Sequence, residues 1–353
     1  MKVEGIHLAG IGTYTPSPTP VEEAVRQGLF EPGAARESGL LSVAVEPALS
    51  APDMAVRAAR QALDQAGHDP GDFAAVVHNG AYYQGPGHWS APHYVLHRAL
   101  DRPIPAFGIA HGCLAVLTSL QLAAGLLEPG SPGRQAVLIT GADNFSTPMF
   151  DRWNDSELAV FADSGVALVA STRGGFAALK AVGSRSAPEL EGIHRGNDSL
   201  LPPARYPDHP WRAASRRQEW AERPGAGPRD LLDSVNRFAE LVAGLAERTL
   251  AEAGVAREAV TRVAPTGFSE NSLHTLILDP LGLPVELSTW DHLRTLGHAT
   301  VGDQVLGLAH LWRSGQVRHG DHVLLVGATE GLEAGCAVLE ITRTARDTEG
   351  RTW

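Results

Sequence analysis

Short, continuously apolar runs alternate along the chain with longer segments in which apolar residues recur every three or four positions. The recurring pattern is clearest at residues 52–67, where Pro52 and Asp53 are helix start signals and Gly67 is a stop signal. The continuous runs are typical of buried strands. They occupy residues 3–14, 73–77, 104–110, 136–142 and 165–169. This alternation predicts an α/β protein in which sheets and helices form layers.

The second half of the chain repeats the pattern of the first. Residues 59–67 (ARQALDQAG) match residues 246–254 (AERTLAEAG), and residues 136–142 (AVLITGA) match residues 323–328 (VLLVGA). A self-match over so long a period indicates duplication of an α/β unit rather than a short-period solenoid. We therefore expect two similar halves, with helices between and outside their sheets.

Residues 185–229 interrupt this pattern. The segment is rich in proline, arginine and tryptophan, and it is too long for a plain connection. We interpret it as an insertion that covers a site, with Trp211 and Trp220 as candidate pocket residues whose indole rings could stack on a substrate. The alternative is a solvated linker.

Composition excludes several classes of function. With 353 residues, of which 43% are hydrophobic and 20% charged, the chain can bury a large core. A formal net charge of −11 argues against binding of nucleic acid or an anionic membrane surface. No apolar run reaches transmembrane length, and the first residues predict a strand rather than a signal peptide. Two cysteines are too few for a disulfide framework, which favours a cytoplasmic protein. The spacing of the histidines suggests no metal site.

Cys113 lies where a predicted strand turns into a predicted helix. Gly112 permits a sharp turn, and residues 113–127 have helical spacing. The free N–H groups and the dipole of a helix start favour a thiolate, so we expect a lowered pKa for Cys113. A nucleophile at a strand–turn–helix bend is a recurring device. The alternative is a small buried cysteine that packs as a hydrophobic residue.

Four stretches, spread in order over nearly the whole chain, resemble the β-ketoacyl synthase III family. They are residues 10–14 (GIGTY), 112–113 (GC), 161–167 (FADSGVA) and the glycine-rich residues 320–337. The resemblance implies the thiolase fold, with duplicated βαβαβαββ halves in a five-layer αβαβα arrangement. The halves would be residues 1–172, with Cys113, and residues 173–353. It also implies a homodimer that takes acyl-coenzyme A or acyl-carrier-protein thioesters and holds no permanently bound cofactor.

The departures from the family pattern concern the partners of the cysteine. Thr266 stands where condensing members have a histidine, and His298 stands where they have an asparagine. Asp303 follows five residues later, and a helix capped by Thr300 would fold it back toward the His298 ring. The resulting Cys-His-Asp set resembles a smaller branch that includes cervimycin malonyltransferase-type O-acyltransferases. Thr266 would line the pocket or fill the space that the histidine left.

These replacements predict general-base chemistry. Decarboxylative condensation needs two polar groups at the thioester oxygen, whereas acyl transfer to a hydroxyl needs a base for the acceptor's proton. An imidazole oriented by a carboxylate meets that need. We therefore expect acyl transfer through acyl-Cys113, with His298 as base, Asp303 as its orienting partner, and no decarboxylation. The resemblance implies that the backbone N–H groups of Cys113 and Gly331 hold the oxyanion.

The acceptor would be a hydroxyl of a sugar or polyketide natural product, or a second carrier. Two alternatives remain open. One is a decarboxylative starter-unit condensing enzyme, and the other is an inactive subunit that only binds carriers. His298 could also be a satisfied structural histidine, and Asp303 could be a first-turn residue that the helix dipole favours.

Overall fold

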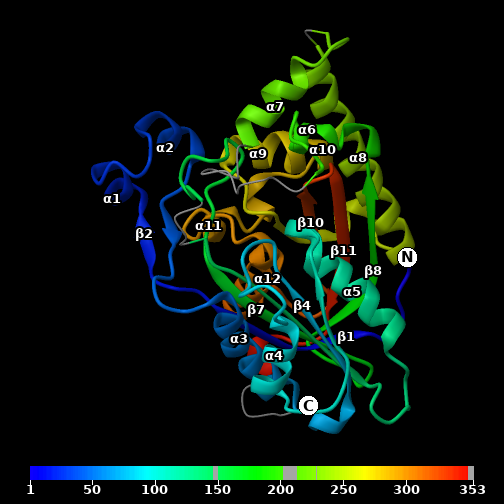
Figure 1. Ribbon diagram of the computed structural model, residues 1–353. Coiled ribbons are helices and arrows are strands. Elements are labelled where there is room, and N and C mark those ends of the chain that lie inside the picture. The colour runs from blue at the N-terminus through cyan, green and yellow to red at the C-terminus, as the bar shows by residue number, and fades with distance from the viewer. Residues whose placement is uncertain (146–149, 202–212, 228, 349–353) are drawn as a thin grey trace.

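In the computed structural model, which describes residues 1–145, 150–201, 213–227 and 229–348, most of the strands form one large mixed sheet. This nine-stranded sheet has the order β5-β4-β6-β7-β1-β8-β11-β10-β9 (Figure 1). The strands are β1 (His7–Tyr14), β4 (Phe73–Asn79), β5 (Ala106–Ile109), β6 (Ala136–Asp143), β7 (Ser164–Ser171), β8 (Ala177–Ser186), β9 (Val260–Pro265), β10 (His322–Thr329) and β11 (Glu333–Ile341).

The two ends of this sheet have the same internal order. In the first half, β4 runs parallel to β5 and β6, while β7 is antiparallel to both β6 and β1. In the second half, β9 is parallel to β10, and β11 is antiparallel to both β10 and β8. The matched runs 136–142 and 323–328 thus lie on equivalent strands, β6 and β10. At the position that β5 occupies in the first half, the described part of the second half has the isolated bridge between Val263 and Ser288.

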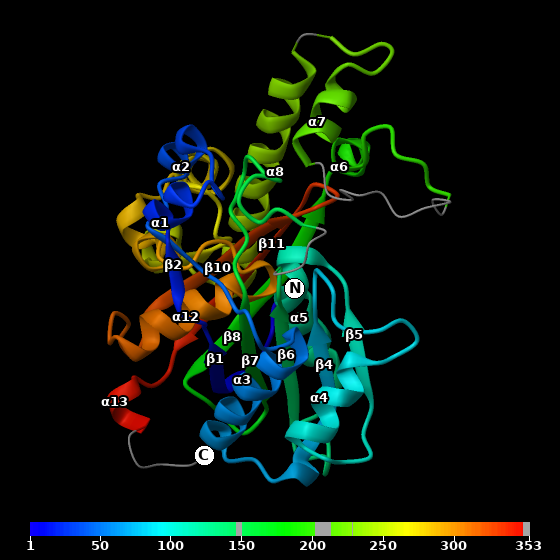
Figure 2. The same cartoon turned by 60° about the vertical axis from the view of Figure 1, so that its left-hand side comes forward.

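The helices lie on both outer sides of the sheet and between its halves (Figure 2). On the outer side of the first half, α3 (Ala51–Ala66) contacts β1, β6 and β7, and α4 (Ala91–Ala99) packs beside it. On the other outer side, α8 (Asp230–Ala253) contacts β8 and β11. Two helices, α5 (Ala115–Leu126) and α12 (Asp303–Arg313), each contact strands of both halves. This is the αβαβα arrangement expected of the thiolase fold.

Small residues allow α3 to lie very close to β1. The helix begins where Ser50 accepts a hydrogen bond from the Asp53 N–H, and it ends at Gly67, which has a φ of 61°. A Cβ atom at Gly10 or Gly12 of β1 would lie 1.9 Å from a carbonyl oxygen of α3. The glycines of the first strand are therefore required by helix–sheet packing, and the helix predicted at 52–67 is confirmed.

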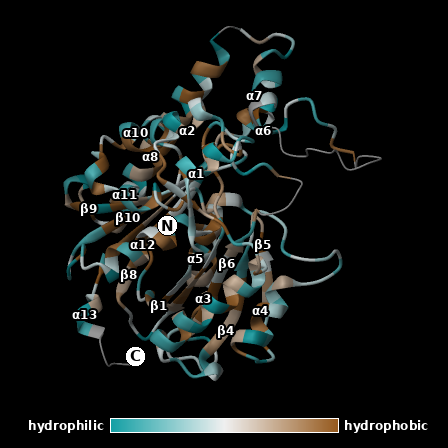
Figure 3. Cartoon of the chain, turned by 90° about the vertical axis from the view of Figure 1, so that its left-hand side faces the viewer, coloured by the Kyte–Doolittle hydropathy of each residue, from teal (hydrophilic) through white to brown (hydrophobic). Residues whose placement is uncertain are grey.

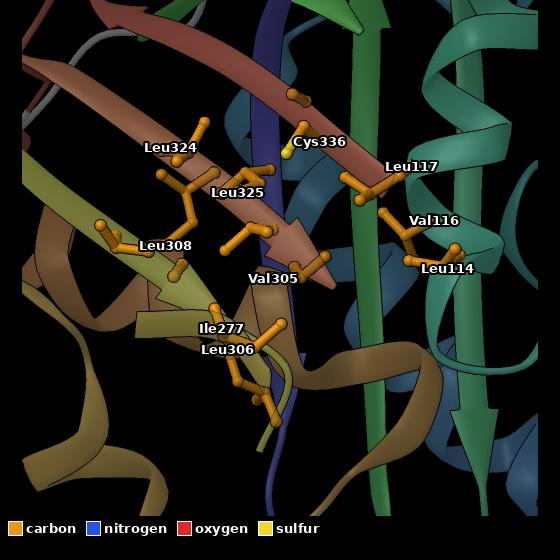
Figure 4. Packing of buried hydrophobic residues seen from close by; sticks show 14 of the residues in the cluster. Leu114, Val116, Leu117, Ile277, Val305, Leu306, Leu308, Leu324, Leu325 and Cys336 are labelled. Atoms are coloured by element: carbon orange, nitrogen blue, oxygen red, sulfur yellow. The ribbon is translucent and has the colours of Figure 1, made fainter. Parts of the chain in front are cut away.

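The central core holds the start of α5 in place. Leu114, Val116 and Leu117 are buried beside Cys336 of β11 (Figure 4). From the other side, α12 contributes Val305 to the same cluster. Figure 3 shows apolar residues concentrated on the central strands and on the inward faces of the helices. Because the cluster joins α5, α12 and the second-half strands, it fixes the residues at the first turns of both helices.

The remaining elements are short. The strands β2 (Pro18–Pro20) and β3 (Ser42–Ala44) form a separate pair. The short helices are α1 (Val21–Arg26), α2 (Pro32–Ser38), α6 (Gly192–Arg195), α7 (Ala213–Ala221), α9 (Glu270–Leu273), α10 (Asp279–Leu281), α11 (Trp290–Leu293) and α13 (Ala345–Thr348). A π-helical turn, His274–Leu278, follows α9. The longest apolar stretches of the described helices fall short of what crossing a bilayer requires.

Candidate active site

Cys113 lies in a tight turn between β5 and α5. The 3-10 turn Gly112–Leu114 leads directly into α5, and Gly112 has a φ of 46°. A Cβ atom at position 112 would lie 2.1 Å from the side-chain oxygens of Thr329 and Glu330. Glycine is therefore required twice, by the backbone conformation and by the β10–β11 turn that packs against it. The sequence-based placement of Cys113 at a strand–helix bend agrees with this geometry.

The structure brings Cys113, His298 and Asp303 together. The Cys113 Sγ atom is 3.1 Å from His298 Nε2, and His298 Nδ1 is 2.6 Å from Asp303 Oδ2. All three side chains are buried. Asp303 also accepts hydrogen bonds from the N–H groups of Gly267 at 2.7 Å and Ala299 at 2.8 Å. The carboxylate is thus held from three directions, and it directs the Nδ1 proton so that Nε2 faces the sulfur.

Asp303 reaches the imidazole because of an unusual turn after His298. Thr300 has a φ of 47°, in the left-handed region, and the turn ends where α12 begins at Asp303. The expectation that Thr300 caps this helix is wrong, because its hydroxyl donates to the buried carboxylate of Asp143 instead. Asp143 ends β6 and also accepts from the N–H groups of Ala81 and Tyr82. It thereby ties the first half of the chain to the turn that carries His298.

Hydrogen bonds and aromatic rings also orient His298. Its N–H donates to the Val160 carbonyl and its carbonyl accepts from the Ala162 N–H, each at 2.8 Å. The rings of Phe161 and Phe268 lie 5.2 and 5.8 Å from the imidazole, measured between centroids. The imidazole therefore has backbone anchors and apolar walls as well as its carboxylate partner.

Burial changes the protonation of the pair formed by Cys113 and His298. Burial raises the pKa of the Cys113 thiol more than the neighbouring His298 lowers it, so the expected lowering of this pKa is wrong. For His298, burial alone would lower the pKa, but the charges of Cys113 and Asp303 outweigh it and raise the pKa well above 6.5. Both shifts favour the protonated form of each group, so burial and mutual contact make the pair retain a proton.

A cavity of about 320 Å³ opens onto Cys113 and His298. Apolar side chains form most of its wall, including Phe150, Phe161 and Leu332. Residues of α8 at helical spacing form one side, and α6 and α7 add Ile193, His194 and Arg217. The cavity lies beneath α6, α7 and the first turns of α8, which Figure 1 shows beyond the ends of β10 and β11. Such a site suits a largely apolar substrate with a few polar groups.

The segment 185–229 meets the cavity through residues other than the predicted tryptophans. The prediction that Trp220 lines the pocket is wrong, because Trp220 is not among the described residues of the cavity wall. Its ring packs against α6 near Gly192, and the Arg223 guanidinium lies 3.8 Å from the ring centroid. The indole ring is therefore in contact with α6 and with Arg223. Trp211 lies outside the described residues.

Thr266 fills space behind the cavity wall instead of lining the cavity. The residue is fully buried, and its hydroxyl oxygen accepts hydrogen bonds from the Ala328 N–H at 3.2 Å and from Gln304 Nε2 at 3.3 Å. Of the two alternatives open for Thr266, the structure agrees with the space-filling one. Gly331, the expected backbone donor for the oxyanion, lies in the β10–β11 turn with a φ of 83°, between the cavity-wall residues Glu330 and Leu332. Its role at the oxyanion stays a prediction.

Sequence reasoning missed two residues that the structure places beside Cys113. The hydroxyl oxygen of Thr329 accepts a hydrogen bond from the Cys113 N–H at 3.2 Å, and that hydroxyl donates to Glu330 at 2.6 Å. The sequence signal that could have identified them is that Thr329 and Glu330 form a polar pair directly after the apolar residues 323–328. Within the described ranges, no group of three or more His, Cys, Asp or Glu side chains is arranged to hold a metal ion.

Both halves of the chain match known protein families. Residues 107–183 match the model of 3-oxoacyl-[acyl-carrier-protein] synthase III, and residues 250–341 match the model of its C-terminal part. The chain is 30% identical over 296 residues to β-ketoacyl-[acyl-carrier-protein] synthase III 3 of Streptomyces coelicolor, covering 81% of this chain and 82% of that protein. The chain belongs to the 3-oxoacyl-[acyl-carrier-protein] synthase III family.

Solved structures of this family and its neighbours share the fold. A structure named ChlB3 and described as an acyltransferase superposes with a TM-score of 0.87 at 34% identity, covering 96% of this chain and 98% of that one. Synthase III from Pseudomonas aeruginosa superposes with a TM-score of 0.74 at 21% identity, covering 96% and 99%. The thiolase fold is therefore shared with synthase III structures, and the protein belongs to a class of acyl-transferring or condensing enzymes.

Proposed function

We propose that this family member transfers an acyl group from a thioester, through acyl-Cys113, to a hydroxyl acceptor or a second carrier without decarboxylation. The observation that carries this proposal is the position of His298 between the Cys113 sulfur and the Asp303 carboxylate. A base oriented in this way accepts and returns protons, which acyl transfer to oxygen requires and carbanion stabilisation does not.

In the first half-reaction, the Cys113 sulfur attacks the thioester carbonyl carbon while its proton moves to His298 Nε2. The thiol of the donor then leaves with that proton, and Cys113 carries the acyl group. In the second half-reaction, the acceptor hydroxyl gives its proton to Nε2 as its oxygen attacks the acyl carbon. The Cys113 thiolate leaves and recovers the proton. Asp303 stays ionised throughout and stabilises the imidazolium that forms twice.

The relatives suggest the donor and the surroundings of this chemistry. The name of the Streptomyces relative, a synthase, includes the acyl carrier protein, and ChlB3 is described as an acyltransferase. We therefore expect an acyl-carrier-protein or acyl-coenzyme A thioester as donor, and a cytoplasmic homodimer without a resident cofactor. The mostly apolar cavity, with Asn271, Ser272 and Thr275 as polar members of its wall, fits a natural-product acceptor with few hydroxyl groups.

The test separates acyl transfer from decarboxylative condensation, which family membership makes the rival function. The enzyme is incubated with butyryl-coenzyme A or malonyl-coenzyme A and a panel of sugars and polyketide alcohols, and intact mass and carbon dioxide are measured. We expect one acyl adduct on Cys113 and acylated acceptor without carbon dioxide. Stoichiometric carbon dioxide together with a new C–C bond would show a condensing enzyme instead.

The second cysteine provides the matched control. Cys336 is buried in β11, and burial raises its pKa to about 12, so it should not be acylated. Cys113→Ala should abolish the adduct, whereas Cys336→Ala should retain it. An adduct that survives in Cys113→Ala would contradict the assignment of the nucleophile.

A further inference from the structure

The N–H group of Cys113 already has a hydrogen-bond partner. It donates to the hydroxyl oxygen of Thr329 over 3.2 Å, which is at the long end of the range for N–H···O bonds. This N–H is the donor that an oxyanion on the attacked carbonyl carbon would need. A substrate oxygen must therefore share this N–H with Thr329 or take the place of its hydroxyl.

The Thr329 hydroxyl is held at this place by rigid surroundings. Thr329 pairs with Glu333 at the closed end of the β10–β11 hairpin, and its side chain reaches the cavity wall beside Cys113. The hydroxyl has two acceptors within reach, the Glu330 carboxylate at 2.6 Å and the His111 carbonyl at 3.5 Å. Because threonine is stiff at χ1, the backbone fixes the oxygen while the proton can still rotate.

We propose that the Thr329 hydroxyl is a catalytic oxyanion donor that acts together with the Cys113 N–H. This proposal rests on the proposed function, since it assigns the group that stabilises each tetrahedral intermediate. In the free enzyme, the hydroxyl proton points to Glu330. As sulfur adds to the thioester carbon, the carbonyl electron pair moves onto oxygen, and the hydroxyl turns its proton to that oxygen. When the pair returns and the leaving thiol departs, the proton turns back.

The negative charge of Glu330 explains why rotation of the Thr329 hydroxyl would matter for catalysis. Its carboxylate contributes to the raised pKa of Cys113, so its negative charge also disfavours an oxyanion at this place. The Thr329 hydroxyl lies between Glu330 and the site of the oxyanion. It can therefore donate its proton either to the Glu330 carboxylate or to the oxyanion. The Thr329 hydroxyl would be a donor in addition to the backbone N–H groups of Cys113 and Gly331, whose role at the oxyanion stays a prediction.

The experiment compares two reactions of Cys113 that differ in whether an oxyanion forms. Acylation by acetyl-coenzyme A or butyryl-coenzyme A passes through an oxyanion, whereas alkylation by iodoacetamide does not. In Thr329→Val, which keeps the shape and removes the hydroxyl, we expect acylation to slow on the order of 10² to 10³-fold. Alkylation should proceed as in the wild type. Thr329→Ser should recover most of the acylation rate.

A matched control uses the same substitution on the neighbouring strand. Thr261 of β9 donates to the His322 carbonyl and does not line the cavity among the described residues, so Thr261→Val should leave both rates unchanged. Thr329→Val that acylates as fast as the wild type, or faster, would overturn the proposal, because the hydroxyl would then only block the Cys113 N–H. Wild-type enzyme that alkylates but accepts no acyl group would overturn the proposed function itself.

Discussion

Asp303 shows how one side chain both stabilises a turn and orients the His298 imidazole. One carboxylate oxygen accepts from the Ala299 N–H, and the other accepts from the Gly267 N–H and from His298 Nδ1. Each of these contacts needs an acceptor at that oxygen. An amide in the same place would turn its NH₂ group toward at least one donor, so the isosteric change to asparagine cannot satisfy all three.

Asp303→Asn should therefore slow acyl transfer from Cys113 to the acceptor, by a factor on the order of 10² to 10⁴. Because Asp303 helps to raise the pKa of His298, its loss should also move the rising limb of the pH–rate profile to lower pH. Single-turnover transfer from preformed acyl-enzyme, measured from pH 5 to pH 9, checks both effects. A slower rate with an unmoved limb would mean that Asp303 acts on the fold and not on the base.

The sequence could place the reactive residues because each stands in a local pattern. Cys113 follows a strand and a turn-forming glycine, and Asp303 follows His298 by five residues. The contact of Cys113 with Thr329 spans 216 positions, and the contact of Asp143 with Thr300 spans 157. No periodicity or spacing announces contacts of this kind, since tertiary packing alone creates them. The raised pKa of Cys113 was missed for the same reason, because burial depends on the whole fold.

At the scale of elements, α8 has two different roles along its length. Its first turns present Leu231, Ser234, Val235 and Phe238 to the cavity, at the spacing of one helix face. The later turns pack on β8 and β11 as part of the core. The helix is thus anchored at one end, while its other end shapes the space in front of Cys113.

Filling the cavity from α8 should hinder the acceptor more than the donor. Val235→Trp places a large ring in the cavity, and we expect the acceptor KM to rise on the order of 10-fold while acylation of Cys113 stays close to wild type. Leu232→Trp is the matched control, since Leu232 lies on the same helix, is 61% exposed and does not line the described cavity. Steady-state kinetics and self-acylation rates provide the readout. If Val235→Trp slowed Cys113 acylation as much as transfer to the acceptor, the wall formed by α8 would instead contact the acyl donor.

The insertion illustrates which features of an element can be predicted. Its length and composition indicated a cover over a site, and α6 and α7 do contribute to the cavity wall. Which side chains face the cavity could not be predicted: Trp220 is 8% exposed and contacts α6 and Arg223 instead. In a short helix without neighbours of known position, the sequence does not distinguish the inward face from the outward one.

At the scale of the whole molecule, acid should destabilise the fold through neutral buried histidines. His78 of β4 is 2% exposed and lies within hydrogen-bonding distance of Thr140 and Gln84, and burial lowers its pKa from 6.5 to about 4. As the pH falls below 6.5, the unfolded chain binds a proton at this residue before the folded chain does. The contribution of neutral His78 to the free energy of unfolding is therefore fully present above about pH 6.5, and it is lost progressively as the pH falls toward 4.

The expected loss from His78 alone is about 3 kcal/mol between those limits. Urea unfolding at pH 7 and pH 4.5 should show a smaller drop for His78→Gln than for the wild type. His97→Gln should behave as the wild type, because the His97 side chain is 72% exposed. An identical drop in all three proteins would assign the acid sensitivity to other groups.

The join between the halves of the sheet has a consequence for how such an enzyme changes its reaction. The strands β1 and β8 are paired only from His7 to Ala178 and from Leu8 to Ala177, and Cys113 and His298 come from opposite sides of this join. Under the proposed function, acyl loading belongs to the first half of the chain, and the fate of the loaded group belongs to the second half. A lineage can therefore exchange the residues around His298 and acquire a new acceptor chemistry while it inherits its acyl-loading cysteine intact.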